Sequence, residues 1–300
     1  MKRLLLFAAS VALFAFLATP AQAREFPGND NDRPVNTIDS VRRAINDMIA
    51  QFGDDYADGE AYLEELDALE KETPKDGAWL VKFAQFRRKA LLALPELDDL
   101  KLLVVKSSRL PGVDNNWLTI DSVPKEGWDA ELGVLSDLRS DNPQFRTVYK
   151  PENGRPILEP ELHWDGKRVM FSSVSEDNKR WAVFEIDVDG VALKTLSPTD
   201  QPDVDFFDSC YTPEGKVIAC SNASKQGLPC IDGGAPMANV YSIDPETKKA
   251  RQLTYEQDSD WHPTPLKNGR IMYLRWEYSD IPHYFSRILF HMNPDGTNQA

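Results

Sequence analysis

Basic residues are few in this sequence: its 300 residues include 34 Lys and Arg against 48 Asp and Glu, for a formal net charge of −14. Nucleic-acid binding requires a basic surface that neutralises phosphates, and we find no run of clustered Lys or Arg. The composition therefore argues against nucleic acid as a partner and against docking on an anionic membrane surface. Hydrophobic residues at 41% and charged residues at 27% are typical of a globular protein.

The motifs of several enzyme classes are also absent. The chain has no G-x-S-x-G, no Walker loop, no Rossmann fingerprint and no H-E-x-x-H, so a serine or zinc hydrolase is unsupported. Its three cysteines, Cys210, Cys220 and Cys230, do not form a C-x-x-C or C-x-x-C-H pattern. We therefore expect no zinc knuckle and no covalently attached haem within this chain.

Long apolar runs are missing except at the N-terminus. Residues 4–18 are uncharged and apolar and follow Lys2 and Arg3, and residues 19–23 (TPAQA) give an A-x-A cleavage pattern. The run is shorter than the ~20 residues that a membrane span requires. The pattern predicts a signal peptide over residues 1–23, an exported periplasmic or extracellular protein, and no membrane span after cleavage. An uncleaved N-terminal anchor is the alternative.

The remaining chain divides into three parts by its pattern. Residues 24–36 are polar and rich in Pro, Asn and Asp, as in a flexible linker. Residues 37–95 carry apolar residues at spacings of three and four, which predicts three amphipathic helices. Residues 96–300 change to short strand-like runs separated by Gly, Pro, Asn and Asp. We expect a mainly β protein with a small α-helical region before it.

A repeat within residues 96–300 predicts the architecture. Each copy contains strands followed by a long connection and a hairpin whose turn carries Asp-Gly, Glu-Gly or Asn-Gly. The turn glycines, Gly166, Gly215 and Gly269, give a period of about 50 residues, which is typical of β-propeller blades. The pattern predicts a partial propeller of about three blades plus the first strand of a fourth near Arg287, truncated at its C-terminus. A β-sandwich with coincidental turn spacing is the alternative.

Two stretches resemble a known family. They are residues 220–230 (CSNASKQGLPC) and residues 275–296 (RWEYSDIPHYFSRILFHMNPDG). Both are similar to exported bacterial proteins related to the hydrazine synthase α subunit, in its propeller-bearing middle part. The Asp-Gly blades also resemble those of TolB-type periplasmic propellers.

The resemblance implies a periplasmic scaffold within a haem-associated redox protein. If the protein is an enzyme, the resemblance implies an oxidoreductase whose haem c binds downstream of residue 300 and not to this chain. The alternative is a non-catalytic TolB-like propeller that binds a protein or a glycan. Both interpretations imply a protein subunit or a periplasmic ligand as partner. A hydrolase or lyase that uses His283 and Tyr284 is a third hypothesis.

The connection at residues 275–287 mixes aromatic and polar side chains, as ligand-binding faces of propellers do. Within it, His283 and Tyr284 are the candidate catalytic residues. The candidate ligand or partner face also includes residues on both sides of these two: Arg275, Trp276, Glu277, Tyr278, Asp280, Arg287 and, from a neighbouring segment, His262. An inter-blade hydrogen-bond network is the alternative interpretation.

The cysteines suggest a cross-link in an oxidising compartment. Cys220 and Cys230 bracket a loop that contains Gly227 and Pro229, which predicts a disulfide between them. Two buried free thiols, or a bridge from Cys210 to Cys220, are the alternatives.

An acidic segment offers oxygen ligands of the kind that calcium prefers. Its carboxylates are Asp203, Asp205 and Asp208, which makes them calcium candidates. The EF-hand spacing is absent, and solvated turn carboxylates are the alternative.

Overall fold

The structure is a computed structural model that describes residues 37–97, 99–108, 120, 123–177, 179–229, 232–277 and 287–300. The described chain forms two compact units. One holds residues 37–102 and 135–145, and the other holds residues 103–134 and 146–300. Within the described ranges, no helix is both long enough and apolar enough to cross a membrane.

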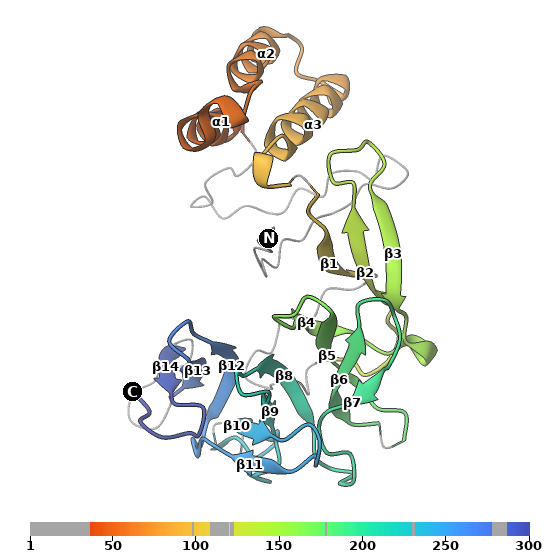
Figure 1. Ribbon diagram of the computed structural model, residues 1–300, viewed down its shortest axis with the longest axis vertical. Helices are drawn as coiled ribbons and strands as arrows, with labels where there is room; N and C mark the ends of the chain where they lie inside the picture. The colour runs from red at the N-terminus through yellow and green to blue at the C-terminus, as the bar shows by residue number, and fades with distance from the viewer. Residues whose placement is uncertain are drawn as a thin grey trace. The chain divides into compact units, whose positions relative to one another are not determined.

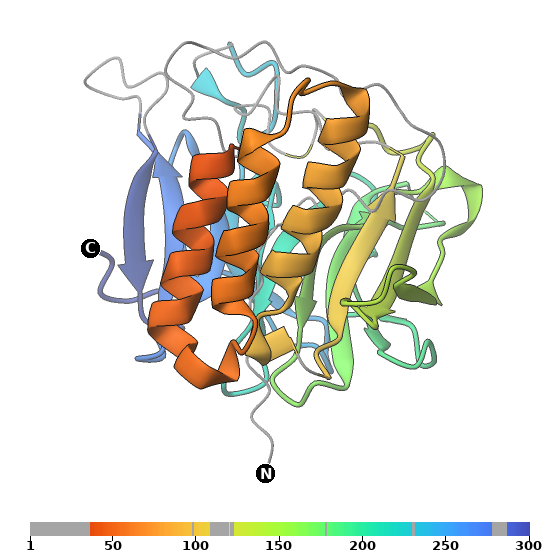
Figure 2. The same cartoon turned by 90° about the horizontal axis from the view of Figure 1, so that it is seen from above.

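Three helices dominate the first unit: α1 (Ile38–Phe52), α2 (Gly59–Lys71) and α3 (Gly77–Leu92). Figure 2 shows them side by side, and each contacts the other two. A short 3-10 helix, η1 (Gly53–Asp55), follows α1, and another, η2 (Pro95–Leu97), follows α3.

Side-chain caps and a small apolar core stabilise this unit. The Thr37 hydroxyl accepts a hydrogen bond from the Ser40 N–H at 3.2 Å, and the Asp76 carboxylate caps α3 in the same manner. The apolar stripes of the helices meet in one buried cluster, whose members are Val41, Ile45, Tyr56, Tyr62, Leu66, Leu69, Trp79, Phe83, Phe86 and Ala90. The helical spacing in the sequence therefore predicted this core.

Four sheets form the β part of the described chain, with strand orders β1-β2-β3, β4-β5-β6-β7, β11-β10-β9-β8 and β12-β13-β14. The pairings in the last three sheets are antiparallel, as in propeller blades. Figure 1 shows these three sheets following one another around the unit. The strands are β1 (Leu102–Ser107), β2 (Ala130–Ser136), β3 (Gln144–Tyr149), β4 (Leu158–Leu162), β5 (Arg168–Val174), β6 (Trp181–Asp187), β7 (Lys194–Thr195), β8 (Phe206–Tyr211), β9 (Val217–Ser221), β10 (Asn239–Ile243), β11 (Ala250–Gln252), β12 (Ser259–Pro265), β13 (Ile271–Trp276) and β14 (Ile288–Met292). A 3-10 helix, η4 (Glu152–Gly154), precedes β4.

The first hairpin of each of the last three sheets contains a glycine with a positive φ angle in its turn. Gly166, Gly215 and Gly269 have φ angles of 69°, 82° and 81°, which glycine adopts without the steric cost of a side chain. The structure also shows which strand begins each sheet. The sequence predicted that the strand after Arg287 begins another blade, but this strand is β14, the third strand of the last sheet. The difference arises because the sequence repeat was counted from the strand after each hairpin.

Apolar side chains pack between neighbouring sheets. Met170, Val183, Phe206 and Tyr241 are buried in one cluster that joins the sheets of β4–β7 and β8–β11. A second cluster joins β8–β11 to β12–β14, and its members are Cys210, Ile218, Val240, Leu253, Ile271, Tyr273 and Met292. Each large side chain buried in this way contributes about 1.5–3 kcal/mol to folding. Both clusters include residues of β8, so this strand packs against the sheets on both of its sides.

Candidate metal site

A bulge interrupts the first strand of three successive sheets. The pairing register shifts once in β4, once in β8 and once in β12. Glu159, Asp208 and His262 lie within these shifts and have positive φ angles of 52°, 49° and 54°. A positive φ costs a residue with a side chain on the order of 1–3 kcal/mol, and such residues cluster at functional sites. The bulge therefore recurs in three sheets, and each bulge carries one residue with an acidic or imidazole side chain.

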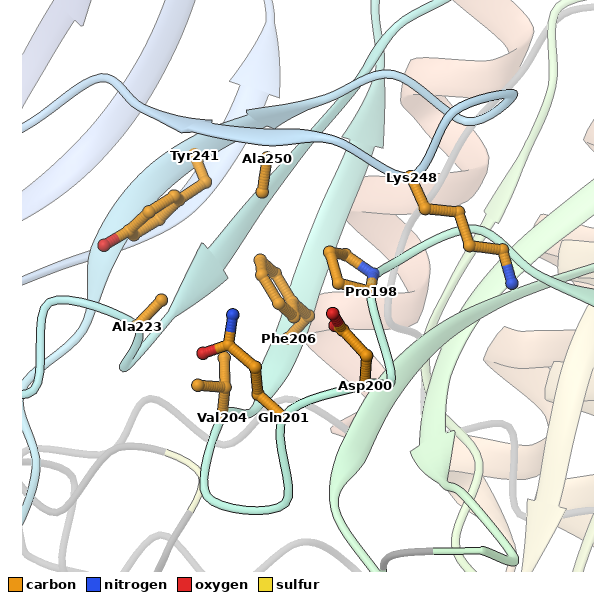
Figure 3. A pocket seen from close by; sticks show the side chains of 9 residues that line it. All are labelled: Pro198, Asp200, Gln201, Val204, Phe206, Ala223, Tyr241, Lys248 and Ala250. Atoms are coloured by element: carbon orange, nitrogen blue, oxygen red, sulfur yellow. The ribbon is translucent and has the colours of Figure 1, made fainter.

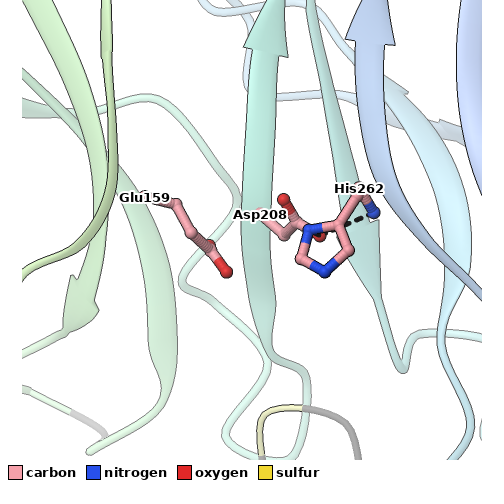
Figure 4. A group of neighbouring side chains, drawn as sticks. All are labelled: Glu159, Asp208 and His262. Atoms are coloured by element: carbon pink, nitrogen blue, oxygen red, sulfur yellow. Dashed lines mark hydrogen bonds and ion pairs between the residues drawn. The ribbon is translucent and has the colours of Figure 1, made fainter. Parts of the chain in front are cut away.

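The three bulged residues meet in space, as Figure 4 shows. One ligand-type atom from each of Glu159, Asp208 and His262 lies within 4.8 Å of the other two. We call these residues the three-strand site. The side chain of Asp208 is 11% exposed and that of His262 is 61% exposed, so solvent reaches the site at the imidazole.

Hydrogen bonds hold the site across the sheets. The Ser172 hydroxyl on β5 accepts from the Asp208 N–H and donates to Oε2 of Glu159, both at 3.0 Å. Oδ2 of Asp208 accepts from the His262 N–H at 2.7 Å and lies 2.9 Å from Nδ1 of the same residue. In β8 and β12, a side chain of the preceding sheet thus satisfies the N–H of the bulged residue.

Proximity changes the proton affinity of two of these groups. Burial, together with the nearby Asp208 carboxylate, raises the pKa of Glu159 to about 8. The hydrogen bond to Asp208, and its negative charge, raise the pKa of His262 to about 9. At neutral pH and without a cation, Glu159 is therefore protonated and His262 is an imidazolium beside Asp208. A divalent cation would take the place of these protons, because metal ligands bind in their deprotonated forms.

The chemistry of the three side chains fits a divalent ion. Carboxylate oxygens and an imidazole nitrogen are ligands for zinc, manganese and ferrous iron. Three protein ligands would leave coordination positions for water or another molecule, and the exposed imidazole lies where such a molecule could enter.

A partly buried carboxyl group, that of Glu161, lies close to the site but outside the group of three. Oε1 of Glu161 on β4 accepts from the Tyr211 N–H at 3.1 Å. Burial raises the pKa of Glu161 to about 7. Its hydrogen bond joins the first strands of two sheets, which indicates a structural role.

The structure describes four residues of the connection at residues 275–287, namely residues 275–277 and Arg287. His283, Tyr284, Tyr278 and Asp280 lie outside the described residues. Glu277 is described and partly buried.

The described members of this connection pack into the protein. Nε of Arg275 lies 3.0 Å from Asp260 and 3.6 Å from Glu256. Trp276 is fully buried. The Arg287 guanidinium lies 4.7 Å from the ring centre of Trp276 and 5.1 Å from that of Trp261, as in a cation–π contact. Of the residues predicted for the ligand face, the structure brings His262 into the three-strand site.

The cysteines differ from the predicted cross-link. Cys210 and Cys220 are free thiols with no exposed surface, and Cys230 lies outside the described residues. The structure therefore does not support the Cys220–Cys230 disulfide, and a Cys210–Cys220 bridge is wrong. Cys220 lies within β9, where its Sγ is 3.8 Å from Oδ2 of Asp208 and 3.6 Å from the Asp260 carbonyl oxygen.

The side-chain carboxylates of the three calcium candidates do not converge on one another. Asp203 pairs with Lys225 at the surface. Asp205 is fully buried and accepts from the Trp181 N–H at 2.8 Å. Asp208 belongs to the three-strand site. The structure thus gives each carboxylate its own environment.

The repeats contain a sequence signal for the three-strand site, which is a constant spacing to the turn glycine. Each of its residues lies seven positions before the glycine of its hairpin turn: Glu159 before Gly166, Asp208 before Gly215, and His262 before Gly269. Sequence reasoning missed Glu159 because it compared the turns of the repeats and did not compare their first strands.

A separate cavity of about 210 Å³ lies against the sheet of β8–β11 (Figure 3). Its aromatic lining residues, Phe206 and Tyr241, form an edge-to-face pair with ring centres 6.1 Å apart. Asp200, Gln201 and Lys248 supply polar atoms to its lining. The cavity has room for a small ligand, but its lining mixes opposite charges and contains no group of metal ligands.

Comparison with known proteins identifies the fold. No protein-family model and no curated protein matches the sequence. Among solved structures, hydrazine synthase of Kuenenia stuttgartiensis is similar, with a TM-score of 0.53 and 16% identity over 67% of this chain and 31% of that chain. A putative TolB of Agrobacterium tumefaciens has a TM-score of 0.41 and 16% identity over 57% of this chain and 56% of that chain.

The chain thus spans 31% of the length of the hydrazine synthase chain and 56% of that of the TolB chain. At 16% identity, the likeness to the hydrazine synthase chain shows the fold alone. The described chain has the fold of a partial β-propeller, which three helices precede in the sequence.

Proposed function

We propose that this propeller binds a divalent metal ion at the three-strand site. The observation that carries the proposal is the convergence of Glu159, Asp208 and His262 within 4.8 Å, from strands of three different sheets. Packing does not explain these residue types, because glycine would adopt the positive φ of each bulge at a lower steric cost.

Electrostatics also supports a cation. Two carboxyl groups in close proximity repel each other when both are ionised, and the raised pKa of Glu159 reflects this repulsion as well as burial. A divalent ion would remove the repulsion and neutralise both carboxylates. His262 would supply a nitrogen ligand in place of the imidazolium that now balances Asp208.

Metal binding can be tested on the purified protein after treatment with a chelator. We expect titration with zinc to show one site. Glu159→Gln or Asp208→Asn should lower the zinc affinity by more than about 100-fold, since mutation of a residue that only hydrogen-bonds to a metal ligand already lowers affinity 10–100-fold. Glu161→Gln is the matched control, because Glu161 is a partly buried carboxyl group on the same strand and lies outside the site. Zinc affinity that is unchanged in both site variants would refute the proposal.

For the whole protein, we infer an exported propeller scaffold within a haem-associated redox protein. The signal-like residues 1–23 and the two stretches that resemble relatives of the hydrazine synthase α subunit support this inference. The haem would bind outside this chain. A TolB-like propeller that binds a protein or a glycan is the alternative, and it requires no haem.

A visible spectrum separates the two interpretations. The full-length protein is exported in a host that matures c-type cytochromes, and a reduced-minus-oxidised spectrum is recorded. A sharp α band is expected for the redox scaffold. A featureless spectrum from folded protein would overturn that inference and leave the binding propeller as the working hypothesis.

A further inference from the structure

The thiol of Cys220 lies directly beside the three-strand site. Its Sγ is 3.8 Å from Oδ2 of Asp208, the same oxygen that accepts from the His262 N–H. The residue has no exposed surface and lies in the middle sheet, on the strand next to β8. The carboxylate that this thiol contacts is thus a proposed metal ligand.

We propose that Cys220 supplies a thiolate ligand to the ion at the three-strand site and so makes the site selective for a thiophilic ion such as zinc. This inference rests on the proposed metal site. As the sulfur–metal bond forms, the thiol proton leaves to solvent and no electron is transferred. Cys220 lies outside the group of three, so Glu159 and His262 must move toward an ion that Cys220 and Asp208 share at their present separation.

The separation of the two atoms fits shared coordination. Typical zinc–sulfur and zinc–oxygen distances of about 2.3 Å and 2.1 Å, with the observed 3.8 Å between Sγ and Oδ2, correspond to an angle of about 120° at the ion. This angle is close to the tetrahedral value. Cys220, Asp208, His262 and Glu159 would then complete four protein ligands.

The ligand set has a consequence for selectivity. Thiolate favours zinc and cobalt over manganese, which prefers oxygen ligands. A site without Cys220 would retain two carboxylates and an imidazole, a set that suits manganese as well as zinc. The thiol therefore decides between the two ions.

Cobalt(II) separates the two questions of whether an ion binds at the three-strand site and whether Cys220 is one of its ligands. Its visible ligand-field bands show that an ion binds, and a sulfur-to-cobalt charge-transfer band in the near ultraviolet shows a thiolate ligand. We expect both bands in the wild-type protein. Cys220→Ser should keep the visible bands and lose the ultraviolet band.

Cys210→Ser is the matched control, because Cys210 is an equally buried thiol in the same sheet. We expect it to keep both bands. We also expect Cys220→Ser to lower zinc affinity by more than about 10-fold and to change manganese affinity by less than about 3-fold.

The outcomes distinguish the inference from the proposed function. Visible bands without the ultraviolet band in the wild-type protein, or an ultraviolet band that persists in Cys220→Ser, would overturn the role of Cys220 and leave the three-strand site intact. The absence of all cobalt bands would overturn both. The wild-type spectrum decides the first point even where Cys220→Ser does not fold.

Discussion

Ser172→Ala tests how the sheets hold the three-strand site. The Ser172 hydroxyl accepts from the Asp208 N–H and donates to Glu159, both at 3.0 Å, and Ser172 is fully buried. Its removal leaves a buried N–H without a partner, which costs about 1–3 kcal/mol. We expect the free energy of unfolding to fall by this amount in urea titrations of the metal-free protein.

The same substitution should weaken metal binding, because Ser172 orients Glu159 and fixes the bulge that carries Asp208. Loss of such a supporting hydrogen bond typically costs 10–100-fold in metal affinity. Isothermal titration with zinc measures this change. A variant that is destabilised as expected but binds zinc with unchanged affinity would refute the argument that Ser172 positions the ligands.

Ser173→Ala provides the matched control. Ser173 is the next residue of β5, is 2% exposed, and donates to the Pro156 carbonyl oxygen at 2.6 Å. Its loss leaves the carbonyl oxygen of buried Pro156 without this donor and should cost about 1–3 kcal/mol of stability, as for Ser172. We expect zinc affinity to stay unchanged, since Ser173 contacts none of the three ligands in the described chain.

Two further predictions concern backbone strain and pH. Gly190→Ala should destabilise the protein by about 2–4 kcal/mol in urea unfolding, because a Cβ there would lie 2.8 Å from the Val148 carbonyl oxygen at a φ of 92°. Gly215→Ala, where φ is 82° and space is open, should cost only about 1 kcal/mol, and equal effects would contradict the steric argument. The melting temperature of the metal-free protein should fall as pH rises from 6.5 through about 9, because Glu159 becomes ionised beside Asp208 and His262 loses the proton that pairs it with Asp208. Asp208→Asn should flatten this dependence, and a wild-type melting temperature that rises over the same range would contradict it.

The fold was accessible from the sequence because its signals are local and repeated. The spacing of apolar residues predicted α1, α2 and α3, and the turn glycines predicted the propeller through a conformation that glycine adopts at low cost. The disulfide was inferred from an oxidising compartment and from the loop that Cys220 and Cys230 bracket. It is not supported, because Cys220 is a free thiol that strand β9 directs into the protein, toward Asp208.

The candidate site was accessible only in part, since it depends on contacts between residues far apart in the chain. His262 and Asp208 were singled out in the sequence for other roles, and Glu159 was not singled out. A bulge leaves little trace in the alternation of apolar and polar residues, because it shifts the register by one position within a short strand. The remaining signal in the sequence was the equal spacing of seven positions between each site residue and the turn glycine of its repeat.

The position of the site on the bulges links its chemistry to the stability of the propeller. A bulge releases an N–H from the strand ladder, and that N–H needs another acceptor when it is buried. The Asp208 carboxylate meets this need for His262, and Ser172 meets it for Asp208. The carboxylate that holds two sheets together is therefore also a proposed ligand of the ion. Metal binding would strengthen the junction of three sheets at the point where their ladders are interrupted, so the stability of the propeller and the occupancy of the site should rise and fall together.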